Sequence, residues 1–423
     1  MIGDRDEHTG VTGQWGHGIN ASNAVDAFIY RPKCNYFWGD GIYINEVTNL
    51  TIDRPICWHN RRQGLSLTSG DGVFIYNPDC SYTKGQNPGA GMDIEPNFNT
   101  QVLRDIKIYN PIFRENGQSV SYPHGLVISL SKLTGATTPN NVQIDIYNAD
   151  IRGNSLLIGT LDGCDGWLRI HNPTIRGAQR SGLHIYNCNS IGLDVDIINP
   201  YIHNPCAAQR NSIYDNPITL EMDTVTAPSV TGMRNVKIYN PQIIYNRGLQ
   251  KEAAIRLINS TSIPQCFRNC TIDNIRTYSV NDAISSTVRL GGGGESAPTD
   301  SSLQITYNED SIYNEISQDG NIDNSYLRSK VRYTGGSSTG IIYLNSTVLA
   351  NDIDFVILND NSSFGSLKIT FGASASPAQR RVKGVSGLPV NGIEIPYGGE
   401  IRLRRVNNDE FEILSANCVV SAI

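Results

Sequence analysis

The stretch Ile108-Tyr109-Asn110-Pro111 recurs, with small changes, along the first two thirds of the chain. Most copies have two apolar residues, then asparagine, then proline, and arginine replaces the asparagine in two early copies. The other copies are Ile29-Tyr30-Arg31-Pro32, Ile52-Asp53-Arg54-Pro55, Ile75-Tyr76-Asn77-Pro78, Ile146-Tyr147-Asn148-Ala149, Ile170-His171-Asn172-Pro173, Ile197-Ile198-Asn199-Pro200, Ile238-Tyr239-Asn240-Pro241 and Ile272-Asp273-Asn274-Ile275. Self-similarity at intervals of roughly 20 to 40 residues is typical of a solenoid.

A second pattern, glycine followed by alternating apolar residues, lies between copies of the first. It occurs at Gly18, Gly41, Gly64, Gly91, Gly125 and Gly182, and three segments keep the alternation without the glycine, at Ser155, Pro217 and Ala254. Each repeat therefore holds at least two short period-2 segments, with no helical periodicity between them. This pattern predicts a parallel β-helix, in which each strand lies about 4.8 Å above its predecessor.

Stacked coils place residues of one repeat position in columns. We expect the asparagine column to form an internal ladder, whose side-chain amides satisfy backbone groups at a bend. The residues before these asparagines form an outward column that includes Tyr76, Tyr109, Tyr147 and His171. These rings suit packing against neighbouring subunits or loops, or stacking of sugar rings, and the first role is favoured.

Composition agrees with a long all-β protein. Of 423 residues, 39% are hydrophobic, 17% are charged and 40 are glycine. The net charge of −6, without a lysine- and arginine-rich run, argues against nucleic acid as a partner. No apolar run approaches the roughly 20 residues of a membrane span. Membrane insertion is not expected, and the charged start Asp4-Arg5-Asp6-Glu7-His8 is unlike a secretion signal.

Cysteine usage predicts a reduced protein. The chain has nine cysteines, an odd number, and Cys34, Cys57 and Cys80 recur 23 residues apart at one repeat position. Stacked thiols in a core column are favoured over a disulfide framework. We therefore expect assembly in a reducing cytoplasm.

The repeat fades after about residue 280, and a glycine-rich segment follows. We expect a β-helix of about nine coils over residues 1–290, a connection over 291–303 and an antiparallel β-sandwich over 304–423. The sandwich would cap the open end of the helix, and trimerisation or carbohydrate binding are candidate roles for it. Because the repeat already runs at Gly18, we expect a natural N-terminal part to be missing.

The chain resembles bacteriophage tailspikes and related polysaccharide-degrading proteins of the pectate-lyase-like β-helix superfamily. The resemblance covers the whole chain and rests locally on Gly39-Asp40-Gly41-Ile42-Tyr43, Asn60-Arg61-Arg62-Gln63-Gly64 and Gly91-Met92-Asp93-Ile94-Glu95-Pro96. It implies a right-handed all-β parallel β-helix and a homotrimer that binds, and usually cuts, a bacterial surface polysaccharide such as capsule or O-antigen. It also implies a place in the virion tail, extracellular when acting, with attachment to other tail proteins through the missing N-terminal part. Assembly would take place in the cytoplasm of the bacterial host.

Alternation along the strands indicates where the chemistry lies. If the apolar residue after each glycine points inward, the glycine and the next-but-one residue point outward. The glycine column would then form a low floor for a polymer, with Asp93 and Glu95 beside it. Carboxylates at i and i+2 have Cα atoms about 7 Å apart, which allows either a retaining or an inverting glycosidase geometry. A solvated surface pair is the plainer interpretation of two such acids, but the preceding glycine-rich segment 85–91 favours function.

Further candidates surround this pair. Asp40 is a third catalytic candidate, although alternation turns it inward, where it would tie down a corner by hydrogen bonds. The candidate substrate-binding residues are Arg62, Tyr43, His124, Glu115, His184 and Tyr186. Arg62 suits an acidic sugar or the tuning of a carboxylate pKa. His124 is expected to point inward. Glu115 lies in a loop from which it could reach over the acidic pair, but a plain exposed turn is favoured for it.

The sequence contains no HExxH, CxxC or EF-hand pattern, no P-loop and no nucleophile elbow. No metal or cofactor is therefore expected. The leading hypothesis is an endo-acting glycoside hydrolase that uses Asp93 and Glu95 as acid and base or nucleophile. The alternatives are a polysaccharide lyase acting by β-elimination and a glycan-binding adhesin or structural spike without turnover.

Overall fold

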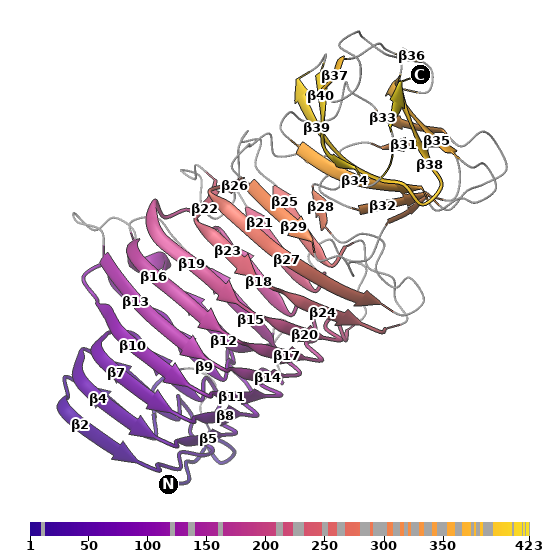
Figure 1. Ribbon diagram of the computed structural model, residues 1–423. Coiled ribbons are helices and arrows are strands. Elements are labelled where there is room, and N and C mark those ends of the chain that lie inside the picture. The colour runs from indigo at the N-terminus through magenta and orange to yellow at the C-terminus, as the bar shows by residue number, and fades with distance from the viewer. Residues whose placement is uncertain are drawn as a thin grey trace.

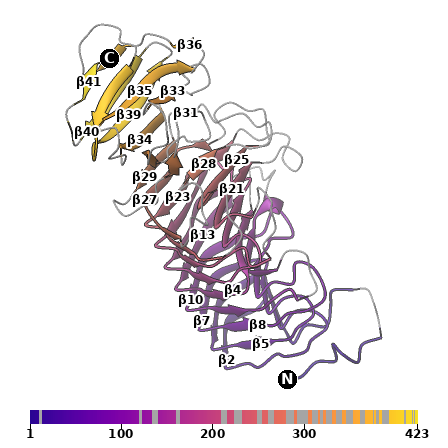
Figure 2. The ribbon, with the colours of Figure 1, turned by 90° about the vertical axis from the view of Figure 1, so that its right-hand side faces the viewer.

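The computed structural model is an elongated stack of strands, with the N-terminus at one end and the C-terminal sheets at the other (Figure 1, Figure 2). It describes residues 1–9, 13–118, 123–133, 140–159, 164–208, 215–222, 232–247, 253–259, 267–279, 288–290, 303–307, 314–316, 320–322, 330–333, 341–344, 353–359, 366–373, 376–377, 381–383, 392–407, 410–416, 418 and 420–422. Within these ranges, no helix is long or apolar enough to cross a membrane.

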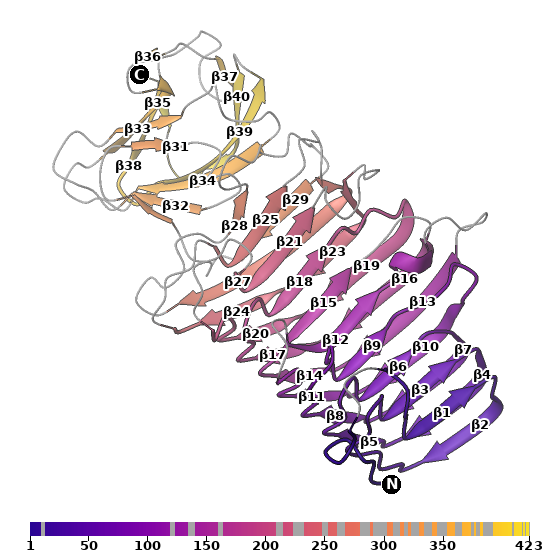
Figure 3. The same ribbon diagram turned by 180° about the vertical axis from the view of Figure 1, so that it is seen from behind.

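Three parallel stacks of strands run along the rod. The first stack, which faces the viewer in Figure 3, contains β1 (Ile19–Ser22), β3 (Ile42–Asn45), β6 (Leu65–Leu67), β9 (Met92–Ile94), β12 (His124–Ser129), β15 (Ser155–Gly159), β18 (Leu183–Tyr186), β21 (Ile218–Met222), β25 (Ile255–Asn259) and β28 (Val288–Leu290). The second contains β2 (Val25–Tyr30), β4 (Val47–Asp53), β7 (Gly70–Tyr76), β10 (Leu103–Tyr109), β13 (Asn140–Tyr147), β16 (Cys164–His171), β19 (Gly192–Ile198), β23 (Val236–Tyr239), β27 (Cys270–Ser279) and β29 (Leu303–Tyr307). The third contains β5 (Ile56–Trp58), β8 (Asp79–Ser81), β11 (Ile112–Arg114), β14 (Asp150–Arg152), β17 (Thr174–Arg176), β20 (Tyr201–His203) and β24 (Gln242–Tyr245).

The repeat copies lie directly above one another, as the sequence predicts. Ile75 pairs with Ile108, Ile108 with Ile146, and Ile146 with Ile170, all in parallel register. Inward residues of the stacks are fully buried, among them Ile42, Leu65, Met92, Leu126 and Leu183 of the first stack. The coils therefore share one continuous apolar core, and the predicted parallel β-helix is confirmed.

The cysteine column also lies in this core. Cys57 and Cys80 are register partners on β5 and β8, and Cys34 precedes them on the coil before. All three are buried free thiols.

The asparagine ladder exists, but the prediction that it is internal is wrong. From Asn110 onward, each side-chain amide donates to the side-chain oxygen of the asparagine one coil earlier, over distances of 2.7 to 3.1 Å. The ladder residues are Asn77, Asn110, Asn148, Asn172, Asn199, Asn240 and Asn274. Their φ angles of 49 to 55° are left-handed, a conformation that asparagine tolerates at the bend between the second and third stacks. This bend turns the side chains outward, so the ladder lies on the surface.

The glycine column is likewise not the groove floor that alternation predicts. A Cβ on Gly64 would lie 2.5 Å from the Cβ of Cys80, and one on Gly91 would lie 2.6 Å from Cδ1 of Phe113. These glycines therefore face side chains of the third stack inside a corner. The strand rule does not apply to Gly64 and Gly91 because each precedes its strand, Gly64 before β6 and Gly91 before β9.

Substitution of Gly91 by alanine should therefore destabilise the protein. The new methyl group must displace the Phe113 ring and two carbonyl oxygens that lie 2.7 Å from its position, at an expected cost of about 1–3 kcal/mol. The midpoint of urea-induced unfolding measures this loss. Thr48→Ala, at an exposed position on β4, should leave the midpoint unchanged. An unaltered midpoint for Gly91→Ala would show that the corner has spare room.

Two further sheets form the C-terminal part. One contains β30 (Asn314–Ile316), β32 (Lys330–Tyr333), β34 (Ile353–Asn359), β39 (Glu400–Asn407), β40 (Glu410–Ala416) and β37 (Arg381–Lys383). The other contains β31 (Gly320–Ile322), β33 (Ile341–Leu344), β35 (Ser366–Ala373), β38 (Gly392–Pro396), β41 (Ser421–Ala422) and β36 (Ser376–Pro377). The rings of Phe371 on β35 and Phe411 on β40 stack 4.8 Å apart between the two sheets.

Strand pairing in these sheets is mixed. The pairs β34–β39, β39–β40, β35–β38 and β38–β41 are antiparallel, as predicted for this part of the chain. The strands that enter each sheet, β30 to β34 and β31 to β35, are instead parallel, which the sequence did not indicate. Residues 291–302 of the predicted connection lie outside the described residues. Leu303 begins β29, which pairs in parallel with β27 of the helix.

Candidate functional site

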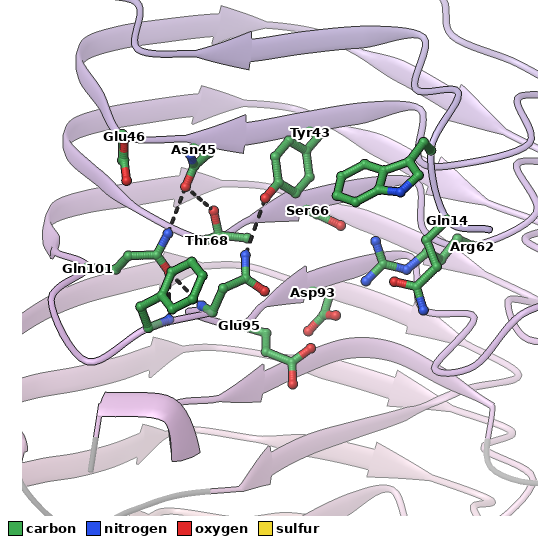
Figure 4. A pocket seen from close by; sticks show the side chains of 13 residues that line it. Gln14, Tyr43, Asn45, Glu46, Arg62, Ser66, Thr68, Asp93, Glu95 and Gln101 are labelled. Carbon is green, nitrogen blue, oxygen red and sulfur yellow. Dashed lines mark hydrogen bonds between the residues drawn. The ribbon is translucent and has the colours of Figure 1, made fainter. Parts of the chain in front are cut away.

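A cavity of about 420 Å³ is hollowed into the outer face of β3, β6 and β9 (Figure 4). Alternate residues of these strands form its floor, because the residues between them point into the core. It is lined by Gln14, Trp15, Tyr43, Asn45, Glu46, Arg62, Ser66, Thr68, Asp93, Glu95, Asn97, Phe98 and Gln101. Four of the sequence-predicted residues, Asp93, Glu95, Arg62 and Tyr43, therefore meet in one space.

Asp93 lies deepest among these groups and is only 2% exposed. Gln63 Nε2 donates to its Oδ2 at 3.1 Å, whereas its Oδ1 and the Oε1 of Gln63 have no hydrogen-bond partner. Burial raises the pKa of Asp93 well above its usual range, the charge of Glu95 adds to this, and Arg62 opposes it. This environment favours the protonated acid, with one oxygen unpartnered.

Glu95 lies two residues after Asp93, on the same outward face, and is half-buried. It lines this first cavity and also a second one described below. The pair therefore combines a deeply buried acid with a more accessible carboxyl group at the junction of two hollows.

Asp40 does not reach the groove. It is 0% exposed and lines neither cavity, so the favoured interpretation, an inward residue that ties down a corner, holds, and the alternative of a groove-facing catalytic residue is corrected. Its carboxylate accepts hydrogen bonds from Arg62 Nη1 at 3.3 Å, Ser66 Oγ at 2.9 Å and the Gln63 backbone N–H at 3.2 Å. Burial raises the pKa of Asp40, and the nearby Arg62 offsets part of the rise. Asp40 thus holds Arg62 and Gln63 in place from behind.

Tyr43 lies at the wall of the cavity. Its ring stacks on His17 with centroids 4.8 Å apart, and its hydroxyl accepts a hydrogen bond from Asn97 Nδ2 at 3.3 Å. The backbone N–H of Asp40 donates to His17 Nδ1 at 3.0 Å, and burial lowers the pKa of this imidazole. Tyr43 is therefore fixed on both sides and presents a rigid surface.

Two aromatic side chains at this cavity were missed by sequence reasoning. Trp15 is 75% exposed and Phe98 is 65% exposed, and both line the cavity. They lie before β1 and in the loop between β9 and β10, outside the repeat, so alternation could not place them. The available signal was a phenylalanine within the polar stretch Asn97-Phe98-Asn99-Thr100.

The second cavity, of about 720 Å³, lies over β12, β15, β18 and β21. His124, His184 and Tyr186 line it, together with Glu221, whose Oε2 is 2.8 Å from His184 Nε2. The full lining is Asn87, Pro88, Glu95, Pro123, His124, Val127, Ser129, Ser155, Leu157, Gly159, Arg180, Ser181, His184, Tyr186 and Glu221. Three further predicted residues thus gather here, next to the acidic pair rather than around it.

His124 lines this cavity instead of turning into the core as predicted. The register of β12 against β15 shifts between His124 and Leu126, and such a bulge re-aims the side chain before it. Its Nδ1 is buried and has no hydrogen-bond partner. Burial, with the positive charges of His184 and Arg180, lowers its pKa from 6.5 to about 3.

Stability is therefore expected to decline below about pH 6.5 in a manner that depends on His124. Its folded-state pKa lies below the unfolded value, so the unfolded chain binds the proton first and acid favours unfolding. Near pH 4.5 the loss attributable to this group is about 2–3 kcal/mol. Unfolding midpoints of the wild type and of His124→Gln, measured at neutral and acid pH, should show a larger acid-induced loss of stability in the wild type than in the variant. A constant difference would contradict the shift.

Glu115 lies away from both cavities. It follows β11 at a left-handed turn and is exposed, with its carboxylate against Gly153 of the next coil. The favoured interpretation, a plain exposed turn, therefore holds, and the alternative that it reaches over the acidic pair is wrong. The outward ring column, in which Tyr76, Tyr109, Tyr147 and His171 stack at 4.5 to 5.1 Å, also borders neither cavity.

The chemistry available in the first cavity is proton transfer between two carboxyl groups in unlike environments, a pattern that separates acid from base. Over the part of the chain that the structure describes, no group of three or more His, Cys, Asp and Glu side chains is arranged to hold a metal ion.

Comparison with known proteins finds only distant structural similarities. No protein-family model matches the chain, and no curated protein sequence matches it. Among solved structures, the A-modules of the mannuronan C-5 epimerases AlgE6 and AlgE4 of Azotobacter vinelandii are 13% and 14% identical to it, both with TM-scores of 0.42. These matches cover 67% and 68% of this chain and 65% and 64% of the epimerase modules.

The receptor-binding domain of the tailspike of siphovirus 9NA is 10% identical, with a TM-score of 0.32, and the match covers 93% of this chain and 65% of that one. The chain thus spans slightly less than two thirds of the length of each of these three structures. Such identities and TM-scores transfer neither a substrate nor a reaction. The parallel β-helix rests on this chain's own strand register.

Proposed function

We propose that the chain is an endo-acting glycoside hydrolase that cuts a bacterial surface polysaccharide, capsule or O-antigen, at the Asp93–Glu95 pair. The observation that carries the proposal is the contrast between these two carboxyl groups on one cavity floor. Asp93 is 2% exposed, with its pKa raised by burial, and Glu95 is half-buried and opens to both hollows. Glycosidases separate the roles of two carboxyl groups by such differences in environment.

In the proposed reaction, Asp93 is the general acid. Its unpartnered Oδ1 would face the glycosidic oxygen and donate the proton as the bond breaks. Glu95 would then activate water or attack the anomeric carbon directly. Arg62 and Tyr43, each held by neighbours, would orient the sugar, and the exposed rings of Trp15 and Phe98 would stack on the apolar faces of its rings.

A lyase acting on a uronic-acid polymer is the main alternative, and the charges argue against it. β-Elimination requires a group that neutralises the uronate carboxylate. Among the described residues that line the first cavity, Arg62 is the one with a permanently cationic side chain, and it already pairs with Asp40. Glu46 and Glu95 border the same space and would repel a uronate.

The proposed setting is a phage tailspike, in agreement with the sequence resemblance. The protein would act as a homotrimer at the virion tail after assembly in the host cytoplasm, attached to other tail proteins. Residues 1–290 would bind and cut the glycan, and the sheets after residue 304 would serve as a cap with trimer or carbohydrate contacts. The proposed mechanism uses no metal or cofactor.

Incubation of the purified protein with capsular and lipopolysaccharide glycans from a panel of bacteria tests the reaction. Mass spectrometry of released oligosaccharides should show fragments one water heavier than the repeat unit. Fragments at the unhydrated mass, with the ultraviolet absorption of a new double bond, would establish a lyase. Binding without fragments would leave an adhesin.

A further inference from the structure

The second cavity has an apolar floor, although its floor residues point away from the core, where polar residues are usual. Asp93 of β9 pairs in register with Val127 of β12, Val127 with Leu157 of β15, and Leu157 with His184 of β18. Along this outward column Val127 and Leu157 are thus two consecutive apolar positions between an acid and a histidine. Val127 is 5% exposed although it points away from the core, so this floor is already screened from bulk water.

This floor is continuous with the first cavity. Glu95 lines both hollows, and Val127 is the register neighbour of Asp93, about 4.8 Å further along the rod. Three such steps separate Asp93 from His184, a span of about 14 Å that fits a short oligosaccharide. A glycan with its scissile bond at Asp93 and Glu95 would lay its next residues on Val127 and Leu157.

Apart from Glu95 at the junction with the first cavity, the charged side chains around this floor are paired with one another. His184 Nε2 lies 2.8 Å from Glu221 Oε2, and Arg180 Nε donates to Asp215 Oδ1 at 2.6 Å. His124 also lines this cavity, and its Nδ1 is buried without a hydrogen-bond partner. The cavity therefore offers apolar area and a neutral hydrogen-bonding group, which suits a sugar that carries no charge.

We propose that the second cavity is a subsite for an uncharged, methyl-bearing sugar residue, either a 6-deoxyhexose or an N-acetylated amino sugar, of the same glycan. The methyl group would lie on Val127 and Leu157, and His124 Nδ1 would bond a hydroxyl or amide of that residue. The position of this residue relative to the cleaved bond rests on the proposed hydrolysis at Asp93 and Glu95, whereas its binding does not.

Saturation-transfer NMR of the full chain with free monosaccharides tests the subsite without any turnover. L-Rhamnose is compared with L-mannose, and N-acetylglucosamine with glucose, so that each pair differs by the methyl-bearing group. Glucuronate is the charged probe. One of the two methyl-bearing sugars should receive the strongest transfer, at its methyl protons. That sugar shows whether the cavity binds a 6-deoxyhexose or an N-acetylated amino sugar.

Leu157→Ser should weaken binding of that sugar about fourfold to fifteenfold, and the signal with it, since a contact of one to two methylene groups is lost. Ile198→Ser is the matched control, because Ile198 is also an outward residue that is half-buried, but on β19 and outside both cavities. Val127→Ser is a second variant in case Leu157→Ser fails to fold. Equal transfer to the sugars without a methyl group, strongest transfer to glucuronate, no transfer at all, or an undiminished signal in both cavity variants would overturn the subsite.

The outcome is independent of the hydrolase proposal. A signal that depends on Leu157, in a protein that cuts none of the panel glycans, would retain the subsite and remove the catalytic assignment. Hydrolysis without methyl-sugar binding would do the reverse.

Discussion

Asp93→Asn should lower kcat by about 10²- to 10⁴-fold on the polysaccharide that the protein cuts, the range expected when a general acid is removed. The asparagine can still accept the hydrogen bond from Gln63 Nε2, so the floor of the cavity should keep its shape. It has no proton to give to the leaving oxygen. Glu95→Gln should cause a comparable loss because an amide neither activates water nor forms the glycosyl intermediate. Initial rates of reducing-end formation measure both effects.

The pH profile distinguishes a catalytic acid from a structural one. Asp93 works only when protonated, so wild-type activity should fall as the pH rises through its raised pKa. This alkaline decline should be missing from the residual activity of Asp93→Asn. Glu46→Gln is the matched control, because Glu46 lines the same cavity but lies outside the pair. Wild-type turnover by the Asp93→Asn, Glu95→Gln double variant would show that other residues catalyse the reaction.

Arg62→Ala should destabilise the protein by about 3 kcal/mol, because removal of one partner leaves the other charge buried. Asp40 is 0% exposed, and the Arg62 guanidinium is the cation closest to its carboxylate. His17 also lies near this carboxylate, but burial lowers the pKa of its imidazole. Without the guanidinium, the pKa of Asp40 rises further above its unfolded value. The penalty should therefore be largest at neutral pH and shrink as acid protonates Asp40. Urea midpoints at two pH values measure this trend.

A double variant separates the lost pair from lost packing. Asp40→Asn together with Arg62→Met removes both charges, and the new amide can still accept from Ser66 and the Gln63 backbone. We expect it to recover most of the stability lost in Arg62→Ala, since neutral replacement of a buried pair costs little. If the double variant is no more stable than Arg62→Ala, the loss comes from packing of the arginine side chain.

The sequence predicts the coils because two periodicities coincide in it. Alternation within a strand turns Ile42 and Ile44 to the core and Tyr43 to the surface. The repeat shows which residues of successive coils correspond, so the pairing register of the strands follows from the sequence alone. Both rules hold only inside strands. The errors lie at corners, where Gly91 faces Phe113 and the ladder asparagines turn outward, and at the bulge that re-aims His124.

The candidate site is predicted in part for the same reason. Asp93 and Glu95 stand in and next to β9, so their shared face follows from alternation. Burial of Asp93 does not follow, because alternation places its side chain on the outward face and the lining segments with Trp15 and Phe98 belong to no repeat. Alternation turned Asp40 inward, and the structure places it there; only the alternative of a groove-facing side chain is wrong.

The surface asparagine ladder also bears on how the protein ages. Asparagine deamidates when the backbone nitrogen of the next residue attacks its side-chain carbonyl and closes a succinimide ring. Proline has no N–H to give up, so this ring closure is blocked at Asn77, Asn110, Asn172, Asn199 and Asn240. Only Asn148 and Asn274 are followed by another residue, Ala149 and Ile275. Five of the seven exposed amides are thereby shielded chemically, and the slow loss of ammonia over time is confined to two positions of the ladder.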